Sequence, residues 1–265
     1  MHNTFAIAGK EARVFLTTWT SYILFGAFML ITAFFFQRLV AEFQFRALQF
    51  MQMQAPNMMD RLNLTDWVIG PLFLNVTVFF LFMLPIMTMR LFAEERRTKT
   101  LELLLTSPVR PIEIVLGKYL SALLMMTIML GLTVLFPLLL TVYGGASSGS
   151  GSPIDWHTLG ATYLGMFLLG AAFVAVGLFA SSVTDSQIVA VIVSFATLLM
   201  FYVIGLASRG QTGMWQGVFD YLSITSHLDA FVRGMVRLVD IVYYLSVAFL
   251  GLFLTHRVIE AQRWR

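Results

Sequence analysis

The stretch RLFAEERRTKTLELLLTSPVRPIEIVLGK, residues 90–118, decides how the chain is organised. It holds four of the 14 acidic and six of the 17 basic residues, and long apolar runs flank it on both sides. The whole chain is 58% hydrophobic and only 12% charged, whereas soluble domains carry about 25% charged residues. Such a chain has too little polar surface to cover a globule in water, so we expect lipid as its solvent and residues 90–118 as its main contact with the aqueous phase.

Six apolar segments that lack Asp, Glu, Lys and Arg are candidates to cross a bilayer, which takes roughly 20 residues. Their approximate bounds are 19–37, 68–89, 119–143, 157–180, 187–207 and 241–256. The last is short, so its helix is expected to extend back past Asp240. The runs are continuous rather than alternating, which favours helices over a β-barrel. The sequence predicts an all-α integral membrane protein with one transmembrane domain over 1–265.

Residues 1–18 precede the first span and are not a cleavable signal, because the apolar run that follows is too long and lacks a cleavage site. Their apolar positions have helical spacing: Phe5, Ala8, Ala12 and Phe15. Asn3 or Thr4 is a candidate cap for the start of this helix. Two interpretations stay open, an amphipathic helix lying in the membrane surface and a plain extension of the first span.

The distribution of basic residues predicts the orientation of the six spans. The side that holds both termini and the 90–118 loop carries eleven Lys and Arg: Lys10, Arg13, Arg90, Arg96, Arg97, Lys99, Arg110, Lys118, Arg257, Arg263 and Arg265. The other side carries six: Arg38, Arg46, Arg61, Arg209, Arg233 and Arg237. We therefore expect both termini in the cytoplasm.

Two further segments have their own character. Residues 222–240 place apolar side chains on one helical face, which predicts an in-plane or re-entrant helix on the outer side, or else a longer tilted sixth helix; these are Leu228, Phe231, Val232, Met235, Leu238 and Val239. The fourth apolar segment is rich in Gly and Ala, which let helix backbones approach closely. That pattern favours packing within one subunit, with a subunit interface as the alternative.

Several kinds of function lack their motifs. The chain has no Cys, no H-E-x-x-H, no G-x-S-x-G and no Walker A motif, and its four His residues lack metal-ligand spacing. The net charge of +3 is too small to favour nucleic acid. A carrier driven by ions usually keeps ionisable residues inside its spans, and the six segments contain none. We expect no enzyme and no cofactor in this chain, so any ATPase that powers it must be another chain.

The central loop has more structure than a topology signal requires. Glu95 and Lys99 form an i, i+4 pair, and an apolar ridge follows at Leu101, Leu104 and Leu105. Pro108 disfavours helix at Ser107, and Pro111 suits a new helix start. The loop is therefore expected to be helix, break and helix, with 93–106 as a ridge for a partner groove and 111–118 as a lever into the third span. A solvated loop whose charges only set topology is the alternative.

This loop carries a family resemblance. AEERRTKTLELLLTSP (93–108) and PIEIVLGK (111–118) resemble the signature of ABC type-2 transporter permeases, closest to the bacterial gliding-motility and copper-maturation branch. Lys10-Glu11, SSVTDSQIVA (181–190) and the segment from Arg233 to Asp240 are similar to further, weaker parts of the pattern. One departure is Lys99, where relatives often carry Gly.

The resemblance implies a half-transporter in the bacterial inner membrane that pairs with a second permease copy or a homologous permease. It also implies that each half docks on a separate ABC ATPase, which holds the ATP and Mg²⁺. The implied coupling surface consists of Glu94, Glu95, Arg96, Arg97, Thr100, Glu102, Leu104 and Leu105.

The resulting hypothesis is the membrane subunit of an ATP-driven exporter. The first alternative is an ATP-driven mechanical or signalling device that acts on periplasmic partners without moving a solute. An ATP-independent carrier is the second and is disfavoured by the uncharged spans.

Overall fold

The computed structural model describes residues 2–52, 63–100, 109–144, 154–208 and 214–263. All regular elements in these ranges are helical, and six helical stretches are long and apolar enough to cross a membrane. The elements are α1 (His2–Thr17), α2 (Trp19–Gln52), the π-helical turn η1 (Thr65–Ile69), α4 (Gly70–Thr88), α5 (Arg90–Arg97), α7 (Pro111–Leu132), α8 (Leu135–Gly144), α9 (Trp156–Val183), α10 (Gln187–Ser208), α11 (Met214–Leu222), α12 (Ile224–Val232) and α13 (Leu238–Arg263). The predicted all-α membrane fold is confirmed.

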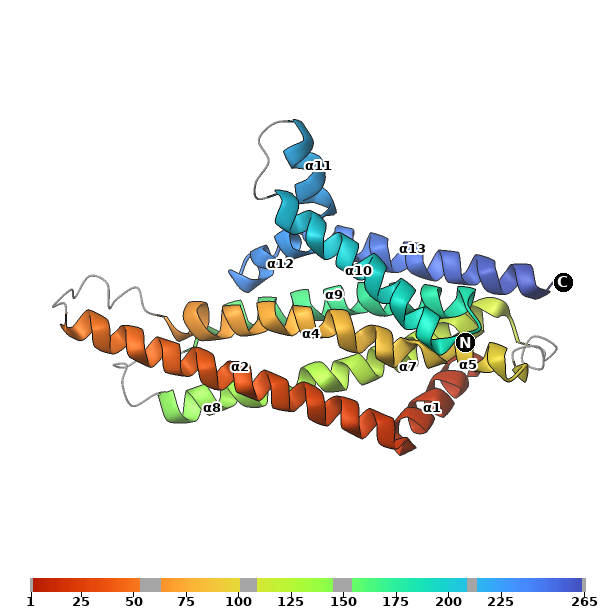
Figure 1. Ribbon diagram of the computed structural model, residues 1–265, viewed down its shortest axis with the longest axis horizontal. Helices are drawn as coiled ribbons and strands as arrows, with labels where there is room; N and C mark the ends of the chain where they lie inside the picture. The colour runs from red at the N-terminus through yellow and green to blue at the C-terminus, as the bar shows by residue number, and fades with distance from the viewer. Residues whose placement is uncertain (1, 53–62, 101–108, 145–153, 209–213, 264–265) are drawn as a thin grey trace.

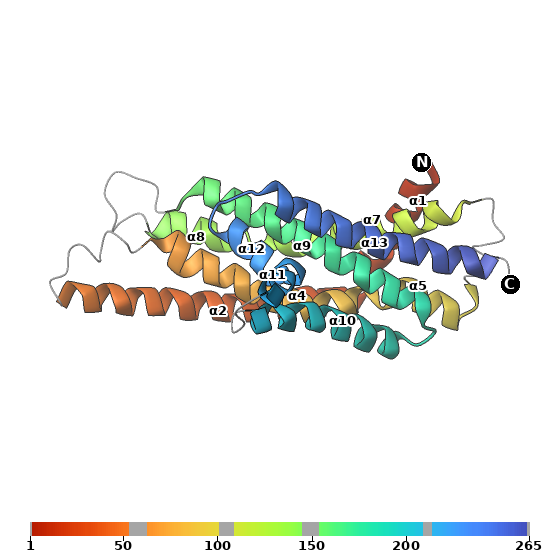
Figure 2. The ribbon, with the colours of Figure 1, turned by 90° about the horizontal axis from the view of Figure 1, so that it is seen from above.

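Helix α9 is the centre of an elongated bundle, with α4, α7, α10 and α13 packed around it (Figures 1 and 2). Its small residues permit this packing. A Cβ atom at Gly165 would lie 2.6 Å from Phe231 of α12, and one at Gly170 would lie 2.8 Å from Met126 of α7. The Gly- and Ala-rich pattern of the fourth span thus serves packing inside one subunit, which was the favoured interpretation.

The first span continues well beyond its apolar segment, and the third span is interrupted. Helix α2 has 34 residues and is about 51 Å long at about 1.5 Å per residue, whereas hydrocarbon is about 30 Å thick. Between α7 and α8, Pro137 has no N–H for the carbonyl of Thr133 and its ring crowds that group. Phe136 N bonds that carbonyl instead, at 3.1 Å, in a tighter turn.

The apolar residues of 222–240 do not share one helical face, so that prediction is wrong. A separate helix, α12, does precede the last span, but it ends at Val232, and the chain turns at Gly234 with φ of 77°. Only glycine adopts that backbone conformation without strain. Beyond the turn, Met235, Leu238 and Val239 are 43%, 76% and 58% exposed. The last span begins at Leu238, so Asp240 lies inside it, as its short apolar segment suggested.

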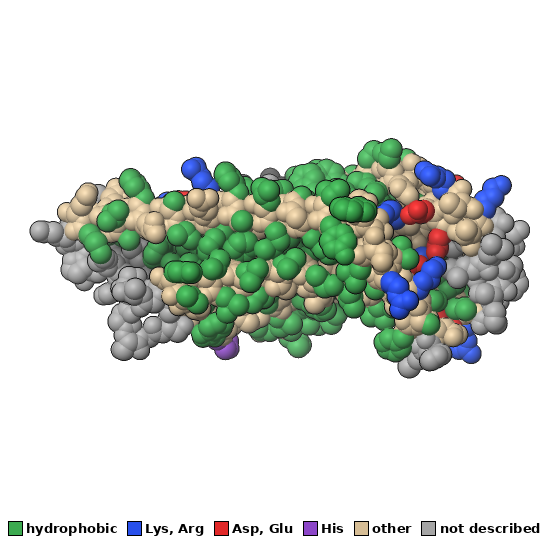
Figure 3. All heavy atoms as spheres, turned by 90° about the horizontal axis from the view of Figure 1, so that it is seen from below, with side chains coloured by type: hydrophobic (Ala, Val, Ile, Leu, Met, Phe, Trp, Pro, Cys, Tyr) green, Lys and Arg blue, Asp and Glu red, His purple; other side chains and the backbone are tan. Residues whose placement is uncertain are grey.

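The charged side chains gather at one end of the bundle. Helices α1 and α5 and the C-terminal end of α13 lie at that end (Figure 1). In Figure 3 most of the visible Lys, Arg, Asp and Glu side chains are there, while hydrophobic side chains cover most of the remaining length. The helix is interrupted at Thr18, between α1 and α2. Helix α1 is therefore a separate helix and not an extension of the first span.

Candidate functional site

The charged end is built on the second span. Helix α4 continues into α5 through Met89, whose backbone stays helical at φ −53° and ψ −35°. The buried hydroxyl of Ser181 in α9 donates to Met89 O at 2.8 Å and lies 3.1 Å from the backbone N–H groups of Phe92 and Ala93, which donate to it. Helix α5 is therefore held as an extension of α4 and fastened to α9.

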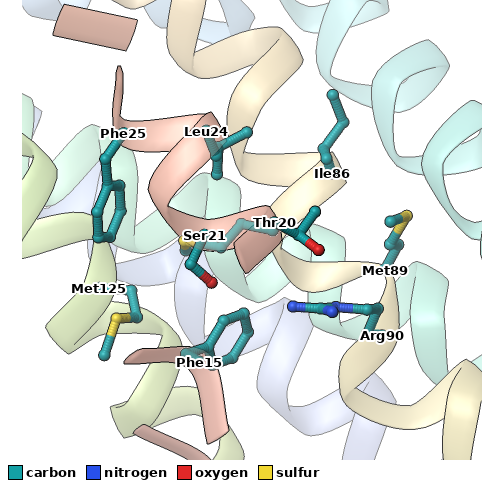
Figure 4. Close-up of a pocket in the computed structure, with 10 residues that line it drawn as sticks. Phe15, Thr20, Ser21, Leu24, Phe25, Ile86, Met89, Arg90 and Met125 are labelled. Carbon is teal, nitrogen blue, oxygen red and sulfur yellow. The ribbon is translucent and has the colours of Figure 1, made fainter. Parts of the chain in front are cut away.

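Two basic side chains connect α5 to its neighbours. Arg96 Nη1 lies 3.2 Å from Asp185 Oδ1 in the turn between α9 and α10. The guanidinium of Arg90 lies 5.6 Å from the ring of Phe15, a cation–π contact. Figure 4 shows Arg90 directed toward Phe15 and Ser21, at the bend between α1 and α2. The cavity there is about 20 Å³, room for about one water and too small for a substrate.

A residue in the left-handed conformation follows the end of helix α5. Lys99 has φ of 57°, and its N–H bonds Arg96 O at 3.0 Å, while the Thr100 hydroxyl donates to Glu95 O at 3.3 Å. A left-handed residue after the last helical turn is a common helix stop that favours glycine. The prediction that Glu95 and Lys99 form a helical ion pair is wrong, because the helix ends at Arg97 and Glu95 turns to Lys118.

A buried lysine joins three elements that are far apart in sequence. Lys118 of α7 has a side chain only 1% exposed, and its Nζ lies 2.8 Å from Glu95 Oε1 of α5 and 3.2 Å from Glu11 Oε1 of α1. Nζ also lies 5.2 Å from the ring of Phe92. The lysine cation between the two carboxylates reduces the repulsion between them. The attraction of both carboxylates offsets the free-energy cost of burying the cation. We call Glu11, Glu95 and Lys118 the three-helix junction.

Helix α1 packs closely on the first turns of α7. A Cβ atom at Gly117 would lie 2.8 Å from Ile7 Cγ2 and 3.0 Å from Thr4 O, so a residue with a side chain would displace α1. Asn3 Nδ2 donates to Glu113 Oε2 at 3.3 Å, which ties the start of α1 to α7 instead of capping α1 alone. Of the apolar positions predicted for α1, Phe15 is buried and Phe5 is 69% exposed, so the placement of α1 in the membrane surface stays a prediction.

The start of α7 follows the sequence prediction. Pro111 is its first residue, where a missing N–H costs nothing. Glu113, three residues after the cap position, accepts a hydrogen bond from the backbone N–H of Arg110 at 3.2 Å. The helix then runs from Pro111 to Leu132 without a break, so the 111–118 segment is continuous with the third span.

The junction lines an open hollow of about 520 Å³ between α1, α5 and α7. Its lining residues are Lys10, Glu11, Val14, Arg90, Leu91, Glu94, Glu95, Thr98, Thr100 and Lys118. The lining carries both signs of charge, which suits a protein surface better than a single small ion.

The predicted coupling residues divide into two groups. Glu94, Arg97 and Thr100 are exposed, while Glu95 and Arg96 are turned partly inward onto Lys118 and Asp185. The remaining three, Glu102, Leu104 and Leu105, lie outside the described residues. The docking role of the set stays a prediction.

The structure adds contacts that the sequence alone did not predict. Lys118 and Asp240 are buried in α7 and α13, and each lies just before the apolar segment, 119–143 or 241–256, that contains no Asp, Glu, Lys or Arg. A signal was available for Lys118, since a lone lysine among apolar helical neighbours must find a counter-charge. Ser181 and Glu11 belong to segments that the family resemblance singled out, but no local signal pointed to their contacts, because their partners come from distant parts of the chain.

Comparison with known protein families identifies the family. The family model described as ABC-2 family transporter protein matches residues 5–238. No curated protein matches the chain. Because the match covers most of the chain, from α1 to the start of α13, the chain belongs to the ABC-2 transporter family and is a multi-span membrane subunit of a transporter.

Proposed function

We propose that this chain is the permease subunit of an ATP-driven exporter, and that a separate ABC ATPase drives it through the 93–108 loop. The three-helix junction is the observation that carries this proposal. Because one lysine pairs with both α1 and α5, a force on either helix reaches the third span through Lys118, and α5 is continuous with the second span. A partner that moves this end therefore moves both spans together.

The exposed residues of α5 and the hollow beside them are the surface that we assign to the ATPase. Glu94 and Arg97 are exposed, and the hollow of about 520 Å³ offers room for a side chain or loop of the partner. Charges of both signs at such a surface favour specificity and orientation more than raw affinity. The inner residues, Glu95 and Arg96, support this surface from behind.

A second copy of the chain, or a homologous permease, completes the translocation path in this proposal. Two large cavities among the described residues are separate: one lies at the charged end, and another of about 510 Å³, lined in part by Asp66, Asp229 and Arg233, lies toward the opposite end. Large apolar side chains on α2 and α10 are exposed and are available to lipid or to the second copy.

The membrane in this proposal is the bacterial inner membrane, with both termini in the cytoplasm. The shared end of α1, α5 and the last turns of α13 supports this orientation (Figure 1). The signature at 93–108 favours the gliding-motility and copper-maturation branch of the family.

A mechanical role is the second candidate, and the length of α2 favours it. About 20 Å of this helix exceeds the hydrocarbon thickness. Near its far end, Arg46 lies 4.7 Å from the ring of Trp67 and pairs with Glu42 at 2.6 Å. A helix that projects in this way offers a surface to a periplasmic partner.

Charge reversal tests the docking surface. We expect Glu94→Lys combined with Arg97→Glu to reduce co-purification with the partner ABC ATPase, and to leave membrane insertion intact. Glu42→Lys, a reversal at the opposite end, is the matched control. Unchanged co-purification of the double variant would remove α5 as the docking element.

Transport assays separate the two candidate functions. For the exporter, the complex reconstituted in vesicles should show ATP-dependent flux of a solute. Stimulated ATPase activity without flux for any candidate solute would favour the mechanical device.

A further inference from the structure

A groove on the outside of the bundle separates the first turns of α7 from the last turns of α13. The two helices lie side by side at the charged end (Figure 2), and the groove between them has a volume of about 430 Å³. Among the described residues it shares no lining side chain with the hollow at the three-helix junction. We call it the α7–α13 groove.

Most of the lining of this groove is apolar. The apolar side chains are Ile112, Val115 and Leu116 of α7 and Phe249, Leu252 and Phe253 of α13. Val115 is buried and forms the floor, whereas Ile112, Phe249 and Phe253 are exposed, so the groove opens outward from the bundle. In a bilayer an apolar surface of this kind meets lipid, and an elongated apolar chain fits it.

The polar side chains of the lining gather at one end of the groove. His256, Arg257 and Glu260 come from the turns of α13 at and just beyond the end of its apolar segment, 241–256. The groove therefore crosses the level at which the last span passes from hydrocarbon to the headgroup region. Apolar surface followed by charged surface is the order of acyl chain and headgroup in a phospholipid, and basic pockets between spans bind such headgroups.

Arg257 supplies the cation at the polar end of the groove. Its guanidinium lies 5.3 Å from the ring of Phe253, and its Nη1 lies 3.1 Å from Glu260 Oε2. These two contacts hold the guanidinium over the apolar lining. A guanidinium has five N–H donors, and the contact with Glu260 engages only part of them. The others suit phosphate oxygens, which arginine binds through charge-assisted hydrogen bonds.

The start of α7 adds positive potential to the same region. Ile112 belongs to the first turn of α7, where backbone N–H groups without a partner inside the helix carry a partial positive charge. Arg110, at the cap position, is exposed. The acid of this turn, Glu113, accepts hydrogen bonds from Asn3 of α1 and from the Arg110 backbone. The surroundings of the groove therefore favour an anionic headgroup.

We propose that the α7–α13 groove binds an anionic phospholipid, with an acyl chain along the apolar lining and the phosphate beside Arg257. A bound lipid fills the space between the third and the last span at the charged end, and so supports the contact between these helices. Anionic lipids are found in the cytoplasmic leaflet, which agrees with the orientation proposed for this end. The inference does not depend on ATP coupling.

Native mass spectrometry of the full chain, released from detergent micelles, measures lipid binding. Phosphatidylglycerol and phosphatidylcholine with the same acyl chains are the probes, because they differ in headgroup charge. Arg257→Gln should weaken binding of the first phosphatidylglycerol about fivefold, the contribution of one basic residue beside an anionic lipid, and should weaken phosphatidylcholine less. Arg233→Gln is the matched control, since Arg233 pairs with Asp229 as Arg257 pairs with Glu260 and is 68% exposed against 63%; it should leave binding unchanged.

Leu116→Trp tests the apolar part of the groove. The larger ring takes up space that the acyl chain needs, so we expect weaker binding of both lipids. Leu120→Trp places the same ring one turn further along α7, at a residue outside the lining that is 38% exposed against 37% for Leu116. This second variant should leave lipid binding unchanged.

Several results would overturn the proposal. If Arg257→Gln and Arg233→Gln bind phosphatidylglycerol equally well, no headgroup is held at Arg257. If inorganic phosphate at the same concentration displaces phosphatidylglycerol, the groove is a site for a free anion and not for a lipid. A dimer that Leu116→Trp abolishes while lipid binding stays unchanged would assign the groove to a second copy of the chain.

Discussion

Replacement of Lys118 by methionine tests whether the three-helix junction holds this end of the molecule together. Methionine keeps the apolar stem of the side chain and removes the charge between Glu11 and Glu95. Loss of one partner from a buried ion pair costs about 3–5 kcal/mol. Because the two glutamates keep 14% and 19% of their side-chain exposure, water screens part of the effect, and we expect about 3 kcal/mol, or roughly 150-fold in the unfolding equilibrium.

The matched control removes all the charges together. In the triple variant Lys118→Met, Glu11→Gln and Glu95→Gln, no uncompensated charge remains, so most of the lost stability should return. Equilibrium unfolding in detergent micelles measures both variants. Hydrogen exchange of α1 supplies a local readout, and protection there should drop in Lys118→Met and recover in the triple variant.

Two results would refute this reasoning. If Lys118→Met unfolds within about 0.5 kcal/mol of the wild type, a value typical of surface substitutions, the junction does not stabilise the fold. If the triple variant recovers nothing, uncompensated charge on Glu11 and Glu95 is not the cause of the loss.

The remaining predictions concern backbone, packing and pH. Lys99→Gly should stabilise the chain by about 0.5–1 kcal/mol, because a φ of 57° strains a residue that has a Cβ. Lys99→Val should destabilise the chain, and equal unfolding midpoints for the two variants would contradict the left-handed conformation at residue 99. Gly117→Ala should destabilise the chain and reduce the hydrogen-exchange protection of α1. Gly131→Ala on the same helix, where a Cβ meets nothing within 4 Å, should instead stabilise the chain by up to about 1 kcal/mol through helix propensity. Higher stability in both variants would exclude close packing of α1 at Gly117. Hydrogen bonds from the Thr158 hydroxyl and the His157 backbone N–H lower the pKa of the Asp155 carboxyl, so its stabilising effect is present above the unfolded value of about 3.9 and is lost as pH falls through the lower folded value. The stability difference between wild type and Asp155→Asn should accordingly shrink on acidification below about pH 4, and a constant difference in unfolding between pH 2 and 6 would argue against this cap.

The fold could be predicted largely from the sequence because lipid imposes simple rules. Continuous apolar runs must become helices when no water satisfies their backbone, and a proline such as Pro111 marks a helix start. The small residues of the fourth span predicted close helix packing, because Gly and Ala let helix backbones approach each other in lipid. The continuation of α2 to Gln52 was predictable as well, because the Gln- and Met-rich stretch after residue 37 is amphipathic and suits a helix outside the membrane.

The charged end was predictable only as a location. Density of charge at 90–118 identifies the segment, and helical spacing pairs Glu95 with Lys99. The structure instead joins Glu95 to Lys118, because Lys99 adopts a left-handed backbone and ends the helix. The contribution of Glu11 depends on the packing of α1 at Gly117, and local spacing carries no information about a contact across more than 100 residues.

The central position of α9 has a consequence for how the chain assembles during its synthesis. It is the fourth of the six candidate spans, so α4 and α7 enter the membrane before the helix on which they pack. Until α9 arrives, surfaces such as those around Thr88 and Met126 meet lipid or the insertion machinery, and the core forms only after roughly two thirds of the chain has been made. A nascent chain halted before residue 156 would therefore lack its main packing partner, and substitutions that enlarge the small residues of α9 should lower the yield of inserted protein before they affect transport.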